Sequence, residues 1–197
     1  LRPESALWDT LASLAIQGYE ITPPSLDLGC GNGIFSFITA GGRFSIDYDW
    51  YINADPRGFW QNKDIYNICK TTDIGKFITR KPGYNFSCGL DHKPSLLKQA
   101  QALSFYKTLV NADANARLPF GNGQFSTIFS NILYWLGDPG KSLKELNRII
   151  TKKGTLIICV PNRKFFHYCV SYQWKKRKSE LLRLLNRGRS ESICWST

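Results

Sequence analysis

Three glycines on alternate positions follow a short apolar run in the stretch LDLGCGNGIFSF, residues 26–37. Because glycine lacks a Cβ, such a turn can adopt left-handed backbone conformations and lets another group come close to the main chain. The residues SLDL before it have the pattern of a short strand, and NGIFSFITA after it has the pattern of a helix that ends at Gly41 and Gly42. This order of strand, tight turn and helix predicts an α/β fold.

Apolar strands and helices alternate along the rest of the chain. A leading helix is expected within residues 1–20, with an apolar stripe formed by Leu7, Leu11, Leu14 and Ala15. A helix over 94–107 begins at Pro94, and another follows Asp138, its N-cap, with one face formed by Leu143, Leu146, Ile149 and Ile150. Four more strands are predicted at 84–91, 108–113, 125–131 and 154–160.

The uniformly apolar character of these strands sets the fold class. Strands that are apolar on both sides and alternate with helices indicate a Rossmann-like, mostly parallel sheet with helices on both faces. The chain of 197 residues has room for one such domain, so we predict a single domain over 1–197. No apolar run reaches the roughly 18 residues that a membrane span needs.

The glycine turn lies where a parallel α/β sheet binds its ligands, outside the carboxyl end of a strand. The helix that follows it offers free N–H groups to a carboxylate or a phosphate. A dinucleotide-binding turn has the pattern G-x-G-x-x-G, but Ile34 stands where its last glycine would be, and Gly33 comes one residue early. The spacing therefore disfavours a nicotinamide cofactor.

The pattern that remains is D-x-G-x-G-x-G, and it resembles motif I of the class I S-adenosylmethionine-dependent methyltransferases. The resemblance extends from about Leu26 to Asn162. It implies S-adenosylmethionine as the methyl donor, with S-adenosylhomocysteine as the product. It also implies that the turn binds this cofactor through Asp27, Gly29, Cys30, Gly31, Asn32 and Gly33.

Three further parts of the family pattern follow on the predicted strand ends. GLDHK places Asp91 and His92 after the second strand, where the resemblance implies a carboxylate that accepts bonds from both ribose hydroxyls. NADANARLPF places Asp113 and Ala114 after the third strand, where the family contacts the adenine. The fourth-strand segment FSTIFSNILYWL supplies two polar residues beside the methionine portion, Ser130 and Asn131.

Each of these residues also has a purely structural interpretation. The three glycines could form only a tight turn, Asp91 could cap the helix that Pro94 opens, and Asp113 could be a turn residue. Cys30 is expected to serve in packing, because no base stands near it in the sequence. The common register of the motifs on successive strand ends favours the functional interpretation.

Residues for the acceptor are fewer. Tyr134 and Trp135 follow the fourth strand and are expected either to line an acceptor pocket or to be core aromatics. His167, past the fifth strand, is the candidate general base, with a surface or packing role as the alternative. His92 is expected at a helix start. Methyl transfer by in-line displacement needs little side-chain chemistry, and no metal site is predicted.

The sequence departs from the family pattern in two places. Residues 43–84 form an insertion after the first core helix that is rich in aromatic residues, and we expect a packed accessory element there. The family has two further strands after the fifth, and the sequence ends before them, so we expect a chain that is cut short with the fifth strand at an edge.

Positive charge is concentrated near the C-terminus. Residues 141–189 contain fourteen Lys and Arg against two Glu, whereas the rest of the chain has a net charge of −1. Segment 161–197 therefore has the character of a basic, acceptor-side element, whose partner would be an anionic acceptor, an anionic membrane surface or, ranked lower, nucleic acid. A solvated basic face is the alternative.

These observations together predict a cytoplasmic methyltransferase acting on a small-molecule, lipid-linked or saccharide acceptor. Six cysteines without a C-x-x-C pair agree with a reducing compartment. Two alternatives remain: an RNA methyltransferase that uses the basic segment, and a methyltransferase-like scaffold without turnover. The sequence does not indicate an oligomeric state.

Overall fold

The computed structural model describes residues 3–49, 74–162, 164–168, 173–174 and 176–179. The chain divides into two compact units, of which the first ends at Val160 and the second begins at Pro161. This boundary coincides with the start of the predicted segment 161–197. The first unit contains the sheet, and the second contains the short helix α6 (Phe165–Tyr168).

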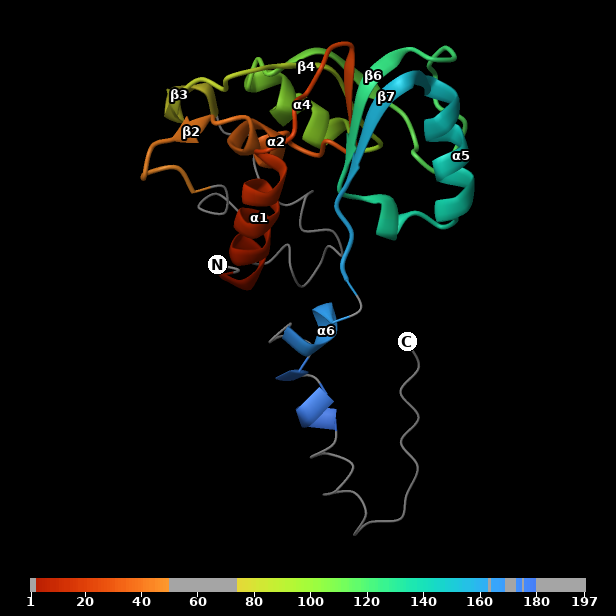
Figure 1. The fold of residues 1–197 in the computed structure, drawn as a ribbon. Helices are drawn as coiled ribbons and strands as arrows, with labels where there is room; N and C mark the ends of the chain where they lie inside the picture. The colour runs from red at the N-terminus through yellow and green to blue at the C-terminus, as the bar shows by residue number, and fades with distance from the viewer. Residues whose placement is uncertain (1–2, 50–73, 163, 169–172, 175, 180–197) are drawn as a thin grey trace, which may run out of the picture. The chain divides into compact units, whose positions relative to one another are not determined.

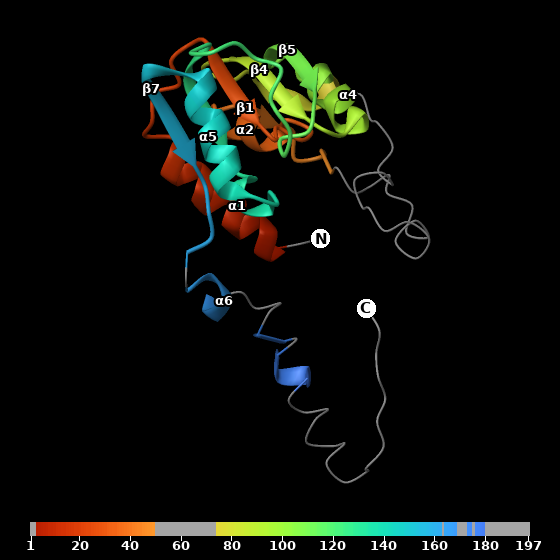
Figure 2. The ribbon, with the colours of Figure 1, turned by 90° about the vertical axis from the view of Figure 1, so that its right-hand side faces the viewer.

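The sheet has five parallel strands in the order β5-β4-β1-β6-β7. Figure 2 shows β7, β1, β4 and β5 following one another across it. The direction of progression reverses between β1 and β6, and the carboxyl ends of all five strands meet at one edge, called the carboxyl edge below. The strands are β1 (Ser25–Leu28), β4 (Phe86–Asp91), β5 (Tyr106–Asn111), β6 (Phe125–Ser130) and β7 (Ile150–Ile158).

Apolar side chains cover both faces of this sheet. On one face, Ile16 and Phe37 from two helices pack with sheet phenylalanines such as Phe86 and Phe129. On the other face, helix α5 packs Leu146 and Ile149 against the sheet, and Figure 1 shows α5 beside β6 and β7. The predicted Rossmann-like α/β fold is thus confirmed. The helices are α1 (Pro3–Ile16), α2 (Ile34–Thr39), α4 (Pro94–Ala102) and α5 (Pro139–Ile149).

The local signals for two helix starts are confirmed. Pro94 lies in the first turn of α4, where a missing N–H costs nothing. Asp138 is the N-cap of α5, and its side chain accepts a bond from the Lys141 amide at 2.9 Å.

The apolar stripe predicted for the leading helix does not face the core. α1 exists, but the leucines of the stripe are exposed, and within residues 7–16 of the helix the buried ones are Ser13 and Ile16. Periodicity identifies an apolar stripe correctly, yet packing against neighbouring elements decides which face is covered. The exposed residues are Leu7, Leu11, Leu14 and Ala15.

Two predicted boundaries are also wrong. The helix after Pro94 ends at Ala102, because Ser104 takes a left-handed conformation with φ 51° and turns the chain into β5. Tyr106 and Lys107, predicted as helical, therefore belong to β5. The fifth strand, predicted over 154–160, is β7, which begins at Ile150 directly after α5 and ends at Ile158. It is an edge strand of the described sheet, as predicted.

The described ends of insertion 43–84 pack against each other. Strands β2 (Arg43–Phe44) and β3 (Ile78–Arg80) pair antiparallel, and a 3-10 turn, η2 (Ile74–Phe77), precedes β3. The Tyr48 ring lies 4.7 Å from that of Phe44 and 5.5 Å from that of Phe77 between centroids. Residues 50–73, with most of the insertion's aromatics, lie outside the described residues. Within the described parts of the chain, no helix is long and apolar enough to cross a membrane.

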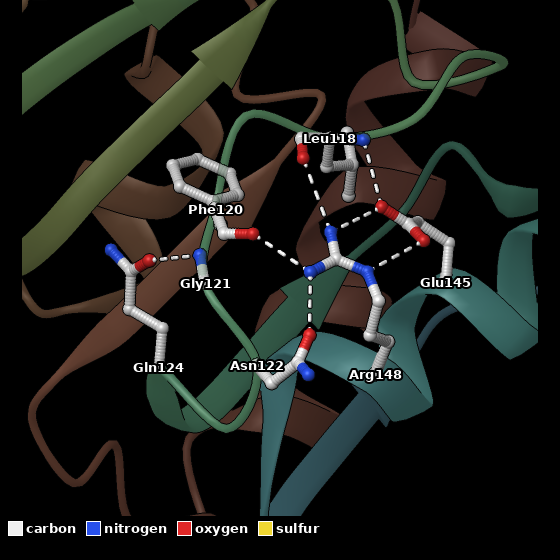
Figure 3. Close-up of polar contacts among 7 residues, drawn as sticks. All are labelled: Leu118, Phe120, Gly121, Asn122, Gln124, Glu145 and Arg148. Carbon is white, nitrogen blue, oxygen red and sulfur yellow. Dashed lines mark hydrogen bonds and ion pairs between the residues drawn. The ribbon is translucent and has the colours of Figure 1, made fainter.

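The guanidinium of Arg148 on α5 binds the loop that leads into β6 (Figure 3). It donates to the carbonyls of Phe120 and Leu118 at 2.8 and 3.1 Å and to the Asn122 side chain at 3.0 Å. Glu145, one helical turn earlier, pairs with the same guanidinium and accepts a bond from the Leu118 amide at 2.8 Å. One planar group thus satisfies several loop acceptors at once.

We expect Arg148→Ala to lower the thermal midpoint clearly, because it leaves the loop carbonyls without this donor and Glu145 without its partner. Lys144→Ala, an exposed position on the same helix, is the matched control. The measurement is thermal unfolding followed by circular dichroism. Equal midpoints for both variants would show that the contacts of Arg148 contribute nothing to stability.

Candidate cofactor site

The glycine turn lies at the carboxyl end of β1, between the ends of β4 and β6. Gly29, Gly31 and Gly33 have φ values of 78°, 56° and 78°, all in the left-handed region that side chains disfavour. The amides of Gly29 and Cys30 donate to the carbonyl of Leu90 at 2.8 and 3.0 Å, which ties the turn to β4. The left-handed backbone conformation of the turn therefore favours glycine at all three positions.

The three glycines differ in what a side chain would meet. At Gly29 a Cβ would overlap the side chain of Ile132, and at Gly33 it would lie 2.8 Å from the Tyr106 ring. At Gly31 the nearest atom to such a Cβ, among the described residues that are not its chain neighbours, is the Cδ1 of Leu96, 4.0 Å away, so open space lies beside this glycine. Protein atoms explain the absence of side chains at the outer two positions, and only the middle one has room beside it for a ligand.

Asp91 ends β4 beside this open space. Its Oδ2 accepts a bond from the Gly31 amide at 3.0 Å, and its Oδ1 accepts one from the Lys93 amide at 2.9 Å. The N-cap of α4 is Lys93, so Asp91 does not cap that helix. Because a carboxylate has about four lone-pair sites, each oxygen can still accept a bond from a ligand hydroxyl.

His92 and Asp113 lie near Asp91 at the carboxyl edge. His92 Nδ1 is 3.6 Å from Asp91 Oδ1, and its side chain is 66% exposed. The exposed Asp113 accepts two bonds from Asn115, from the amide at 2.8 Å and the side chain at 3.0 Å, which hold its pKa below the usual value, with a smaller contribution from His92. Asp113 is thus a turn residue just after the end of β5, and its contact with the cofactor remains a prediction. Ala114 packs partly against the core.

Asp27 lies beneath the turn and is only 1% exposed. Its Oδ2 accepts a bond from the Tyr106 hydroxyl at 2.7 Å. Burial raises the pKa of Asp27 to about 6, although the bonds from Ser36 and Tyr106 lower it. The Asp27 carboxyl group therefore changes from neutral to ionised just below neutral pH.

The other two turn residues have local roles. Cys30 is buried, and burial, together with the charges of Asp27 and Asp91, raises the pKa of its thiol far above the usual range. It is therefore a packed thiol and not a nucleophile, as predicted. The Asn32 side chain accepts a bond from the Ile34 amide at 3.2 Å at the start of α2.

One match to a known protein family bears on this site. A family model described as methyltransferase domain matches residues 76–158, which run from just before β3 to the end of β7. Over these residues the chain is similar to a methyltransferase domain. The methyl donor of this family, S-adenosylmethionine, is the cofactor that the domain implies. No curated protein sequence matches the chain.

Two solved structures share the fold of the methyltransferase domain. One is a methyltransferase of Thermotoga maritima described as a possible histamine N-methyltransferase, with a TM-score of 0.51 and 15% identity over 85% of this chain. The other is the Haloferax volcanii complex of the Trm112 methyltransferase activator with a methyltransferase, with a TM-score of 0.50 and 19% identity over 88% of this chain. This chain spans 57% and 60% of the lengths of the two matched chains.

The residues predicted beside the methionine portion lie at the carboxyl end of β6. Ser130 is buried, its carbonyl accepts a bond from the Cys159 amide at 2.9 Å, and its hydroxyl accepts one from the Ile132 amide at 3.4 Å. Asn131 is partly buried. Their contact with the cofactor remains a prediction.

The aromatic pair after β6 is not part of the core. Tyr134 and Trp135 lie in the 3-10 turn η3 (Leu133–Trp135), with rings 5.2 Å apart, and Trp135 is 75% exposed. This excludes the core alternative and keeps the acceptor pocket as a prediction. His167 lies in α6 of the second unit and is exposed, and its role as a base remains a prediction. Within the described residues, no group of three His, Cys, Asp or Glu could hold a metal ion.

Sequence reasoning missed the residues that support the turn from below. Tyr106 was expected in a helix, yet its hydroxyl reaches Asp27 across β4. One signal was present: Gly89 stands inside a strand, between Cys88 and Leu90, where glycine often marks the close approach of another group. A Cβ at Gly89 would lie 2.8 Å from the Tyr106 ring.

Proposed function

We propose that this chain binds S-adenosylmethionine and transfers its methyl group to a small-molecule, lipid-linked or saccharide acceptor. The observation that carries the proposal is the open space beside Gly31, next to the Asp91 carboxylate, at the carboxyl edge of a methyltransferase-type sheet. A parallel α/β sheet binds its ligands at this place.

The residues around this space fit the donor. Asp91 would hold the ribose hydroxyls, since both of its oxygens keep acceptor capacity. Asp113 and Ala114, at the end of the neighbouring strand β5, would contact the adenine. The open side of Gly31 lets the methionine end lie against the main chain.

The role of the chain in the reaction is to place two molecules together. The bound donor supplies a methyl group made electrophilic by the sulfonium. Aligning an acceptor with that methyl accounts for most of the catalysis, so the chain contributes orientation and exclusion of water. The exposed rings of Tyr134 and Trp135, after the adjacent strand β6, support an apolar wall for the acceptor, with His167 as the proposed base.

The charge of the C-terminal segment supports the proposed acceptor class. The fourteen Lys and Arg in 141–189 favour an anionic acceptor or an anionic membrane surface over a neutral one. Leu181, Leu182, Leu184 and Leu185, which add an apolar face to this segment in the sequence, lie outside the described residues. We also propose a cytoplasmic location, which the free thiols of the described cysteines Cys30, Cys88 and Cys159 support.

Isothermal titration calorimetry with S-adenosylmethionine tests the donor site. We expect Asp91→Ala to weaken binding about ten- to hundredfold, because a hydrogen bond to a charged group contributes about 1.5–3 kcal/mol. Asp47→Ala removes an exposed carboxylate in the insertion and is the control. Undiminished affinity of Asp91→Ala would refute the ribose placement, and no binding to the unmodified chain would refute the proposed function.

Incubation of the chain with a radiolabelled methyl donor and fractionated lysate identifies the acceptor. Label in the small-molecule, lipid or saccharide fraction is the expected result. Label in RNA, with a steep loss of RNA binding as salt rises, would select the nucleic-acid alternative. Donor binding without label in any fraction would select the scaffold.

A further inference from the structure

The side chain of Tyr106 extends from the edge strand β5 to the region beneath the glycine turn. Tyr106 opens β5, the edge strand, and β4 lies between β5 and β1, which carries Asp27. The hydroxyl of Tyr106 nevertheless donates to Asp27 Oδ2 at 2.7 Å. One side chain thus links the edge strand to the strand that carries the turn.

Glycines make room for this ring at two points. A Cβ at Gly89, on β4, would lie 2.8 Å from Cδ1 of the ring, and a Cβ at Gly33, where α2 begins, would lie 2.8 Å from Cε2. The rings of Phe105 and Phe86 hold Tyr106 at centroid distances of 4.9 and 6.2 Å. Packing therefore holds the ring in position independently of the bond that its hydroxyl makes.

The bond from Tyr106 to Asp27 persists over the working pH range. Burial raises the pKa of the Tyr106 phenol well above its ordinary value, and the charge of Asp27 raises it further, so Tyr106 remains the donor. When Asp27 is ionised, the bond is charge-assisted and correspondingly stronger.

We infer that Tyr106 is a positioning residue of the cofactor site, which sets the glycine turn by packing against Gly33 and by fixing the carboxylate of Asp27 beneath it. This inference rests on the proposed function, since it concerns the affinity for the same donor. In this role Tyr106 touches neither donor nor acceptor. It acts through Asp27 and through the start of α2.

The inference requires that donor affinity depends on pH through Asp27. Its pKa of about 6 makes the carboxyl neutral below that pH, and the bond to Tyr106 is one of the interactions that lower this pKa. Three other ionisable groups face Asp27, and burial raises the pKa of each, so they stay protonated at neutral pH: Cys30, Cys88 and Tyr84. The charge of Asp91 also raises the pKa of Asp27.

The test is Tyr106→Phe, which keeps the ring and removes the donor. The dissociation constant for S-adenosylmethionine is measured between pH 5 and pH 8. We expect about tenfold weaker binding at pH 8, as for the loss of one hydrogen bond to a charged group. The pH below which affinity falls should also move upward, because Asp27 loses an interaction that lowers its pKa.

Tyr84→Phe is the matched control, because Tyr84 lies in the same aromatic cluster and feels the charge of Asp27. Thermal unfolding of both variants checks that each is folded. If Tyr106→Phe binds the donor like Tyr84→Phe, with the same pH profile, the positioning role is overturned while the proposed function stands. If the unmodified chain binds no donor, the proposed function fails first, and this inference fails with it.

Discussion

Gly31→Asn should produce a folded protein that no longer binds S-adenosylmethionine measurably. Asparagine tolerates the left-handed conformation that Gly31 adopts at φ 56°, so the backbone cost is small. Among the described residues other than the chain neighbours of Gly31, only Leu96 Cδ1 comes within 4 Å of a Cβ placed there, so the new side chain would extend into the space proposed for the donor. We expect the dissociation constant to rise by at least about a hundredfold, or about 2.7 kcal/mol.

Gly123→Asn is the matched control for this substitution. Gly123 has φ 59°, lies in the turn before β6, and would place a Cβ in ordinary contact, 3.9 Å from the Ile150 carbonyl oxygen. It therefore imposes the same backbone cost away from the proposed site. Calorimetry and thermal unfolding of both variants separate binding from stability. Normal donor affinity in Gly31→Asn would mean that the open side of Gly31 does not face the ligand.

Gly33→Asn should destabilise the fold, whereas Gly31→Asn should leave it folded. Its Cβ would lie 2.8 Å from the Tyr106 ring and 3.0 Å from Leu103 Cδ1, so overpacking should destabilise the fold by about 1–3 kcal/mol. The same motif thus contains glycines with different functions. The sequence presents all three alike, because a regular spacing does not show which neighbour each glycine approaches.

The candidate site could be predicted to the extent that strand topology determines it. Asp27, Asp91 and Asp113 lie at or just after the ends of consecutive parallel strands, which necessarily meet at one edge of a sheet. The positions of these aspartates at the predicted strand ends were therefore sufficient to predict that they lie at one edge of the sheet. The position of Tyr106 was not predictable in this way, because its contact with Asp27 spans 79 residues and crosses a strand.

The errors in the fold arise where tertiary contacts override local pattern. The leucine stripe of α1 has good helical periodicity, yet the buried face is that of Ser13 and Ile16. Ser104 gives no sequence signal for the left-handed turn that ends the helix and begins β5. The bonds from Arg148 to loop carbonyls follow only from the packing of α5 beside that loop.

Asp27→Asn should make the protein without cofactor more stable at pH 8. Burial raises the pKa of Asp27 from 3.8 to about 6, so the native state binds a proton more tightly than the unfolded state does. Between these two values the contribution of Asp27 to stability falls as pH rises, and above about pH 6 the full cost remains. Since one pKa unit corresponds to about 1.4 kcal/mol, that cost is at most about 3 kcal/mol.

Urea unfolding at several pH values measures this cost. The unfolding free energy of Asp27→Asn minus that of the unmodified chain should be small near pH 4, should grow up to about pH 6, and should then stay constant. Asp138→Asn, at an exposed cap where asparagine also serves, corrects for the loss of one charge. A variant that is less stable than the unmodified chain at pH 8 would contradict the burial cost. A gain in stability accompanied by weaker donor binding would mean that the chain keeps a costly buried carboxylate for function, the exchange of stability for activity expected at a binding site.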